Sequence, residues 1–360
     1  MSATEHPETN SGGSCPVLLL DGGLGTSLQD DYGVTFDKTT PLWSSHLLVS
    51  DQKTLLACQS DFGRVPVDII LTATYQASTA GFAKTRTSDH PDGIDRAGMV
   101  SLVRDAVRIA HEAGQGHGGR VALSIGPYGA CMVPGQEYSG KYDAELDSEA
   151  ALRKWHADRL VAFGEAGAFK SPVAYLALET IPRVDEIRAL RKALDDSGAL
   201  AGDALPYWTA ALFPGESNSL PDGTDVQTAV DAMLDPAVAS TQPWGIGINC
   251  TKLWKLEALV LLYEAAVDRA TEAGWLPKGP PALVLYPDGT NGEVYNTTTQ
   301  TWDLPEGGRA PTGPWDAQMA EIVAGAKARG RWSAVVAGGC CKTSHGMLSN
   351  LKQRLAGEGK

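Results

Sequence analysis

The chain has 360 residues, of which 43% are hydrophobic and 20% charged, and its formal net charge at pH 7 is -13. A run of about 20 apolar residues, the length needed to cross a bilayer, does not occur, so we expect no membrane-spanning segment. The negative charge is not offset by any basic stripe. It therefore argues against a nucleic-acid partner, because phosphate backbones would be repelled. The length is compatible with one large domain or two ordinary ones.

The first fifteen residues are polar and turn-rich, with neither the basic start nor the apolar core of a secretory signal. We predict a disordered tail over residues 1–15 and, because no linker interrupts the remaining sequence, a single domain over residues 16–360. Six cysteines are too few and too scattered for a disulfide scaffold in a chain of this length. Reduced thiols and a cytoplasmic location are expected. In that compartment clustered cysteines more often indicate metal binding or catalysis.

Eight short apolar runs with β-sheet character follow one another along the chain. They cover residues 17–21, 68–75, 121–127, 175–182, 207–213, 244–250, 282–287 and 333–340. Stretches with helical spacing separate them, as in residues 102–110 and 256–266, and several runs are apolar on both faces, as buried parallel strands are. The alternation predicts an α/β fold, either a closed (β/α)8 TIM barrel or a doubly wound open sheet. The count of eight favours the barrel.

Four longer stretches lack helical spacing and are predicted to be loops: residues 31–45, 79–93, 131–146 and 288–314. Loops of this length in compact domains often act as lids over a site. The ends of the runs are also informative, because barrel active sites lie at the carboxyl ends of the strands. Polar, reactive or glycine residues end seven of the eight runs, at residues 21–23, 72–76, 126–128, 179–182, 249–250, 286–288 and 338–341.

Three cysteines stand at these run ends. Cys250 ends one run and Cys340 and Cys341 end another, so all three would meet at one mouth of a closed barrel. Adjacent strand residues point to opposite faces, so both members of the pair reach one metal only if the chain leaves strand geometry, which Gly338 and Gly339 would allow. Three thiolates suit zinc and leave its fourth position open for a substrate. The alternatives are buried packing cysteines or a disulfide between Cys340 and Cys341.

The remaining metal candidates have simpler interpretations. Cys58 lies in a helical stretch and is expected in the core, Cys15 belongs to the tail, and Cys131 follows the GPYGA turn and could lie near the mouth. His345 is close enough to the cysteine pair to be a ligand. It also stands where a helix begins, so it could instead only cap that helix.

Six motifs taken together resemble those of the homocysteine S-methyltransferase family, which includes betaine-dependent enzymes and the homocysteine domain of cobalamin-dependent methionine synthase. They are LLDGGLGTSL at residues 19–28, TATYQAS at 72–78, SIGPYGA at 124–130, ALETIP at 177–182, GINC at 247–250 and GGCC at 338–341. Each is weak alone, but their order and their positions at strand ends are specific. The resemblance covers nearly the whole chain after the tail. It implies a zinc-binding (β/α)8 barrel with Cys250, Cys340 and Cys341 as metal ligands.

The resemblance also implies that Asp21 and Glu179 hold the amino group of homocysteine. Carboxylates in a partly dehydrated mouth would bind an ammonium strongly. Without the family, Asp21 is interpreted as a turn former before two glycines and Glu179 as a charge in the first turn of a helix. Further candidate contacts to the substrate are Thr72, Thr74 and the backbone amides near Gly22 and Gly23.

Four aromatic residues are candidates to surround the methyl donor, because an aromatic face attracts a sulfonium cation by roughly 0.5 to 2 kcal/mol. They are Trp43, Tyr75, Tyr128 and Tyr138, each of which is also compatible with ordinary packing. The small acidic turn of many relatives is replaced here by residues 133–138. Residues 342–345 also differ from the family's usual sequence after GGCC. Both differences bear on the choice of donor rather than on the reaction.

These features predict a zinc-dependent homocysteine S-methyltransferase that moves a methyl group from a sulfonium donor to zinc-bound homocysteine thiolate, giving methionine. Zinc would deprotonate the substrate thiol, whose pKa in solution is roughly 8.5. S-methylmethionine is the expected donor, followed by S-adenosylmethionine. Betaine is less favoured, and a corrinoid route is not expected because no cobalamin-binding extension is seen.

Other functions remain compatible with the same residues. One is a selenocysteine or betaine-type methyltransferase of the same family, which would use the same machinery. Another is a non-catalytic barrel with structural zinc. A third is a thiol hydrolase with a cysteine nucleophile, for which the sequence offers no well-placed histidine partner.

Overall fold

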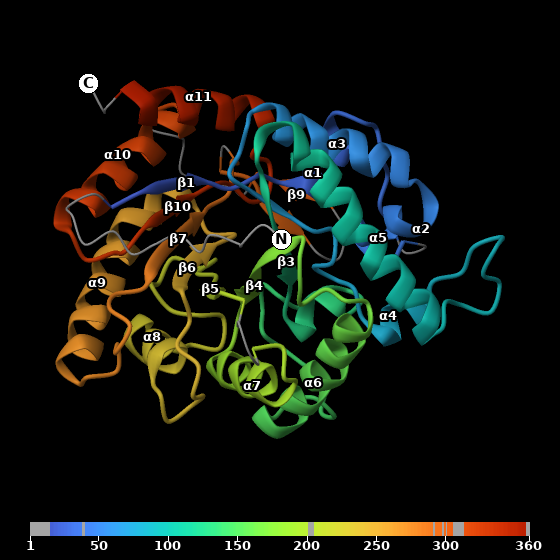
Figure 1. The fold of residues 1–360 in the computed structure, drawn as a ribbon, viewed down its shortest axis with the longest axis horizontal. Helices are drawn as coiled ribbons and strands as arrows, with labels where there is room; N and C mark the ends of the chain where they lie inside the picture. The colour runs from blue at the N-terminus through green and yellow to red at the C-terminus, as the bar shows by residue number, and fades with distance from the viewer. Residues whose placement is uncertain are drawn as a thin grey trace, which may run out of the picture.

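Eight parallel strands surrounded by helices make up the body of the protein (Figure 1). The structure, a computed structural model, describes residues 15–37, 40–200, 205–290, 292–296, 299, 301–304 and 313–357. Each of the eight predicted runs contains one strand. The strands are β1 (Val17–Leu19), β2 (Ile69–Leu71), β3 (Arg120–Ile125), β4 (Val173–Ile181), β5 (Tyr207–Ala211), β6 (Gly245–Asn249), β7 (Ala282–Tyr286) and β10 (Val335–Ala337).

The sheet closes into a barrel. Its strand order is β1-β10-β7-β6-β5-β4-β3-β2, and the pairs are parallel, with Val17 opposite Val335 and Ile69 opposite Arg120. A parallel bridge between Leu20 and Ile69 joins β1 to β2, the two strands at the ends of this order. Two backbone hydrogen bonds support this junction, from Asp21 N–H to the Ile69 carbonyl (3.1 Å) and from Asp68 N–H to the Leu19 carbonyl (2.8 Å). The (β/α)8 barrel prediction is therefore confirmed, and the open doubly wound sheet is excluded.

Helices form the layer outside the strands (Figure 1). They are α1 (Leu24–Asp30), α2 (Leu47–Ser50), α3 (Gln52–Arg64), α4 (Thr79–Lys84), α5 (Arg96–Gly114), α6 (Glu149–Glu165), α7 (Val184–Asp196), α8 (Val226–Leu234), α9 (Leu256–Glu272), α10 (Trp315–Arg329) and α11 (His345–Gly357). Several begin at a side chain that accepts a backbone N–H, as at Asp51, Asp95, Ser148 and Asp225. No helix within the described ranges is long and apolar enough to cross a membrane.

Two apolar cores hold the barrel together. The larger core lies between the strands and the helices, where Val103 of α5 and Leu259 of α9 are buried at the predicted helical spacing. The smaller core fills the barrel interior and includes Leu20, Trp208 and Tyr286. The indole N–H of Trp208 donates to the Tyr286 hydroxyl across the interior (3.2 Å), so the large polar aromatics there are hydrogen-bonded as well as packed. The interior is a packed core that supports the mouth above it.

Some predicted boundaries differ from the structure. The second and last runs are shorter as strands than predicted, because β2 ends at Leu71 and β10 at Ala337, before the polar segments that follow. The predicted loop at residues 79–93 contains α4, which Ser78 caps by accepting the Gly81 N–H.

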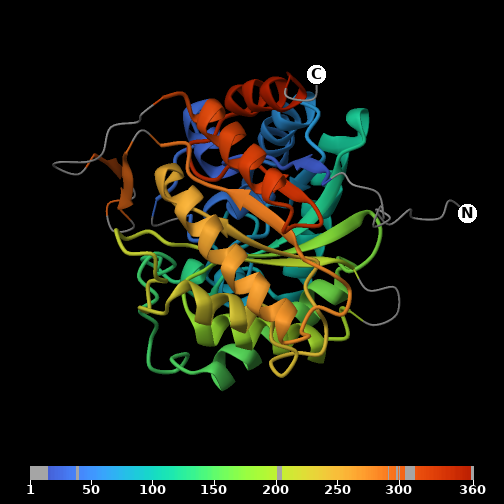
Figure 2. The same ribbon diagram turned by 90° about the vertical axis from the view of Figure 1, so that its left-hand side faces the viewer.

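The predicted loop at residues 288–314 contains the antiparallel pair β8 (Val294–Asn296) and β9 (Thr301–Asp303). Figure 2 shows this hairpin at one edge of the molecule, outside the helical layer. The predicted tail falls largely on residues 1–14, outside the described residues. Its boundary at residue 15 therefore stays a prediction.

Candidate active site

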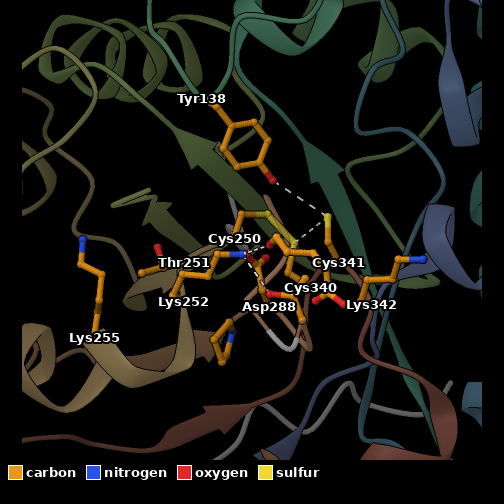
Figure 3. A network of polar contacts seen from close by, with 12 residues as sticks. Tyr138, Cys250, Thr251, Lys252, Lys255, Asp288, Cys340, Cys341 and Lys342 are labelled. Atoms are coloured by element: carbon orange, nitrogen blue, oxygen red, sulfur yellow. Dashed lines mark hydrogen bonds and ion pairs between the residues drawn. A yellow bond between two sulfur atoms is a disulfide. The ribbon is translucent and has the colours of Figure 1, made fainter. Parts of the chain in front are cut away.

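Four side chains that could hold a metal ion meet at the mouth of the barrel. Cys250 follows β6, Asp288 follows β7, and Cys340 and Cys341 follow β10, three strands that are neighbours in the sheet. One ligand atom from each of the four lies within 4.8 Å of the others, and Figure 3 shows the side chains pointing toward a common centre. The predicted convergence of the three cysteines is therefore observed. Three sulfur atoms and a carboxylate oxygen form a donor set that fits zinc.

The chain leaves strand geometry before the cysteine pair, as that convergence requires. β10 ends at Ala337, and neither Gly338 nor Gly339 has a φ in the left-handed region. What requires glycine is close packing: a Cβ on Gly338 would lie 2.8 Å from the Asp21 carbonyl oxygen, and one on Gly339 would lie 2.1 Å from Thr343 Cγ2. Among the four ligand-bearing residues, it is Cys250 that has a positive φ (46°). Gly338 and Gly339 were predicted to supply backbone freedom, but here the absence of a side chain matters because of close packing.

Two of the cysteines are joined to each other. Cys250 and Cys340 form a disulfide with a Cα–Cα distance of 5.5 Å, drawn in Figure 3. The alternative disulfide between Cys340 and Cys341 is therefore wrong, and these two sulfur atoms lie 3.9 Å apart. Metal binding here requires the reduced pair, because thiolates and not disulfide sulfurs are the ligands. Burial, together with the charge of Asp288, raises the pKa of the Cys341 thiol to about 12.

Asp288 was not among the predicted ligands. Its Oδ2 accepts from the Lys252 ammonium (3.3 Å), while its Oδ1 is buried and has no hydrogen-bond partner among the described residues. Burial raises the pKa of this carboxyl above its ordinary value. A cation would satisfy a buried oxygen without a partner, and this carboxylate has an oxygen within 4.8 Å of the three sulfur atoms. Its position directly after β7 was the signal in the sequence that could have identified it.

The two predicted substrate-binding acids line a cavity beside this cluster. Asp21 and Glu179 are 3% and 5% exposed, and both line the cavity that also reaches Cys250, Cys340 and Cys341. Asp21 Oδ2 accepts the Leu71 N–H (2.9 Å), and Glu179 accepts from the Ser124 hydroxyl. Burial raises the pKa of Glu179 to about 7 and that of Asp21 well above its ordinary value, with the Glu179 charge contributing to the latter. A cationic ligand bound beside these two carboxyl groups would stabilise their ionised forms.

The structure separates the other predicted substrate contacts. Gly22, Gly23 and Thr72 line the cavity, but Thr74 does not. The Thr74 hydroxyl donates to the Ser124 carbonyl (2.7 Å), and Thr72 Oγ1 accepts the Ser124 N–H (3.0 Å), so this pair ties the end of β2 to β3. The Gly23 amide donates to the Thr343 carbonyl (3.0 Å).

Three of the four aromatic residues predicted to surround the methyl donor line the cavity. Trp43, Tyr75 and Tyr138 line the cavity, and the Tyr138 hydroxyl lies 4.0 Å from Cys341 Sγ (Figure 3). Tyr128 is not among the lining residues; it packs against Trp155 with a ring-centroid distance of 5.1 Å, and its hydroxyl bonds to Asp143. The lining residues that sequence reasoning missed include Glu137 and the hairpin residues Tyr295 and Trp302.

The other cysteine and histidine candidates for metal binding lie outside the metal-binding cluster. Cys58 is 1% exposed in α3, in the outer core, as predicted. His345 begins α11 and packs edge-on against Phe62, and it does not belong to the metal-binding group. The Cys131 thiol donates to the Gln76 carbonyl (3.4 Å) next to the cavity-lining Met132.

The closed barrel and the cysteine and aspartate cluster define a class, the (β/α)8 barrel proteins with a candidate metal centre at the carboxyl ends of the strands. Comparisons identify the family within that class. The family model described as homocysteine S-methyltransferase matches residues 18–355. The homocysteine S-methyltransferase of Escherichia coli (strain K12) is 30% identical over 346 residues, which are 94% of this chain and 95% of the relative.

A selenocysteine methyltransferase of Astragalus bisulcatus is 27% identical over 94% of this chain and 93% of its own length. The crystal structure of the metallated homocysteine methyltransferase MmuM from Escherichia coli has a TM-score of 0.67 and 26% identity, covering 94% of this chain and 96% of that one. The chain belongs to the homocysteine S-methyltransferase family, and it is a methyltransferase.

Proposed function

We propose that this protein transfers a methyl group from a sulfonium donor to the thiol of homocysteine, giving methionine, with zinc bound by Cys250, Cys340 and Cys341. The observation that carries the proposal is the meeting of these three sulfur atoms and Asp288 within 4.8 Å beside the cavity that contains Asp21 and Glu179. When bound, zinc would act as a Lewis acid that keeps the substrate sulfur a thiolate at neutral pH. Before homocysteine binds, a carboxylate oxygen of Asp288 would serve as the fourth ligand of the zinc.

The residues of the chain position the substrate. Asp21 and Glu179 would hold the homocysteine ammonium, because two buried carboxylates in one cavity are stabilised by a shared cation. The thiolate sulfur then forms a bond to the donor methyl carbon while the bond from that carbon to the sulfonium breaks. The electron pair of the broken bond leaves with the donor, which becomes a neutral thioether. The thiol proton has already been lost to solvent, so no general base is needed in the transfer.

S-methylmethionine is the donor we propose first, and S-adenosylmethionine second. No Lys, Arg or His occurs among the described residues that line the cavity, which suits a donor that carries positive charge. A reducing compartment such as the cytoplasm is part of the proposal, because Cys250 and Cys340 must be thiolates to bind zinc.

The test is methionine formation by the reduced, zinc-loaded protein from homocysteine and each donor separately. We expect the wild type to form methionine, and Cys250→Ser to lose both zinc and activity. The matched control is Cys15→Ser, a half-buried cysteine just before β1, which should keep both. A folded Cys250→Ser protein with full zinc and full activity would show that the metal site is misassigned. A zinc-loaded wild type that forms no methionine from either donor would contradict the proposed reaction.

A second acceptor deserves the same assay because of one relative. The selenocysteine methyltransferase of Astragalus bisulcatus matches nearly the whole chain. Selenocysteine has an ammonium for Asp21 and Glu179 and a soft selenolate for the metal. Replacing homocysteine by selenocysteine in the assay, with both at the same concentration, gives the ratio of kcat/KM values that decides the acceptor.

A further inference from the structure

Glu137 is a buried carboxylate that the reaction described above does not use. It lies in the loop after the short helix at Tyr128–Cys131, is 8% exposed, and lines the same cavity as the cysteines. Its Oε2 has no hydrogen-bond partner within the described part of the chain. A Cβ on Gly135 would lie 2.5 Å from this oxygen, so a glycine there leaves the room that the carboxylate occupies. Burial without a counter-charge raises the pKa of Glu137 to about 7.

The position of Glu137 separates it from the other acids. Its neighbour Tyr138 has its hydroxyl 4.0 Å from Cys341 Sγ. Chain adjacency to Tyr138 therefore places Glu137 on the side of the cavity near the sulfur cluster. Burial raises the pKa of Cys341, Tyr138 and Tyr75, and the Glu137 charge contributes to each shift, which agrees with this position. Asp21 and Glu179 are held at the ends of β2 and β3, where they accept from the Leu71 N–H and the Ser124 hydroxyl.

We propose that Glu137 is the counter-charge for the sulfonium of the methyl donor and thereby selects cationic donors over neutral ones. The inference rests on the proposed function. The methyl that is transferred must approach a sulfur held near the cysteines, so the donor sulfonium lies on this side of the cavity, beside the aromatic rings of Tyr75 and Tyr138. The donor ammonium lies at the other end of its carbon chain, farther from the reacting atoms.

This role has a kinetic consequence. The donor loses its positive charge as the methyl leaves, so a fixed carboxylate stabilises the bound donor more than the transition state. Glu137 is therefore a specificity-determining residue that tightens donor binding and favours release of the neutral thioether product. It is not expected to raise kcat.

The experiment compares a sulfonium with its matching thioether, without homocysteine so that no turnover occurs. The Kd values of S-adenosylmethionine and S-adenosylhomocysteine are measured by calorimetry on the zinc-loaded wild type and on Glu137→Gln. The wild type should prefer the sulfonium, and the Gln variant should lose about ten-fold or more of that preference. Glu137→Asp, which keeps the charge, should retain part of it. The Kd of homocysteine should stay near its wild-type value.

Three results would overturn the inference. One is a wild type that binds the sulfonium no better than the thioether, which needs no variant to observe. Another is equal weakening of both ligands in Glu137→Gln, which would place Glu137 on the amino-acid part that the two share. The third is an unchanged preference in a folded variant. Glu179→Gln serves as the matched control, and it should weaken homocysteine rather than the sulfonium. Methionine formation by the wild type in the same preparation separates failure of this inference from failure of the proposed function.

Discussion

Glu179 shows how a single side chain can serve binding at a cost to stability. It is 5% exposed, and its acceptor bond from Ser124 and its contact with Tyr286 do not offset burial, since its pKa is raised from 4.5 to about 7. The folded protein therefore holds a proton on Glu179 more tightly than the unfolded chain does. The cost of ionising the buried group is absent below about pH 4.5, grows through the window up to about 7, and is complete above it.

We predict that Glu179→Gln stabilises the protein at alkaline pH while weakening homocysteine binding. The amide keeps an acceptor for Ser124 and removes the buried charge, so the free energy of unfolding should rise by up to about 3 kcal/mol near pH 8.5 and by much less near pH 5.5. Urea denaturation at the two pH values measures this, and calorimetry with homocysteine measures the loss of affinity. Glu145→Gln, at an exposed position, is the control. Equal destabilisation at both pH values would mean that hydrogen bonds outweigh burial at Glu179.

At the scale of elements, helix α6 fixes the ends of two strands through one side chain. The Arg159 guanidinium is 2% exposed and donates to the carbonyls of Gly126 (2.7 Å), Tyr75 (2.8 Å) and Thr74 (3.1 Å). These carbonyls belong to the turns that follow β2 and β3, where regular strand pairing has ended. Tyr75 lines the substrate cavity, so the outer helix holds part of the cavity wall in place.

We predict that Arg159→Met lowers the free energy of unfolding by about 3 kcal/mol or more, because three carbonyls lose their buried donor. Arg153→Met on the same helix is the matched control. Arg153 forms an exposed ion pair with Asp196, and its loss should change the free energy of unfolding far less, because exposed ion pairs contribute little to stability. Urea denaturation of both variants provides the comparison. Similar costs for the two would show that Arg159 is not needed to satisfy these turns.

At the scale of the whole molecule, the metal site depends on the fold being complete. Cys250 and Cys340 are 90 residues apart in sequence, and Asp288 comes from a third strand end between theirs in the sheet. An unfolded chain does not hold these ligands together, so zinc should bind the folded protein almost exclusively. The barrel itself has separate apolar cores inside and outside the strands, and neither needs the metal.

We therefore predict that chelation under reducing conditions lowers the melting temperature without removing the helical circular dichroism signal. Free zinc at about 100 times its Kd should add roughly 2.7 kcal/mol to the free energy of unfolding. Thermal melts with and without zinc measure the shift, and Cys250→Ser should show little of it. A wild-type melting temperature that does not respond to zinc would contradict a site built from these ligands.

Residue patterns along the chain predicted the alternation of strands and helices and the meeting of the three cysteines, and they favoured the barrel over an open sheet. Each of the eight strands overlaps one predicted apolar run, and the amphipathic stretches are helices, because strand and helix periodicity depend on neighbouring residues. The clustering of Cys250, Cys340 and Cys341 could be predicted because parallel strands of a barrel end at one mouth. Asp288 stands at a run end as the cysteines do and could have been added to them, whereas Glu137 could not be recognised in this way, since an acid in a loop is usually solvated.

The sequence by itself determined which segments form strands and helices and which reactive side chains stand at strand ends, because these properties are local. Only the tertiary structure decided the closure of the barrel by the bridge between Leu20 and Ile69, and the pairing of Cys250 with Cys340 rather than of Cys340 with Cys341. It also decided that Glu137 is buried without a counter-charge. Each of these depends on distances between residues far apart in the chain, and on the exclusion of water by neighbours that local sequence does not specify.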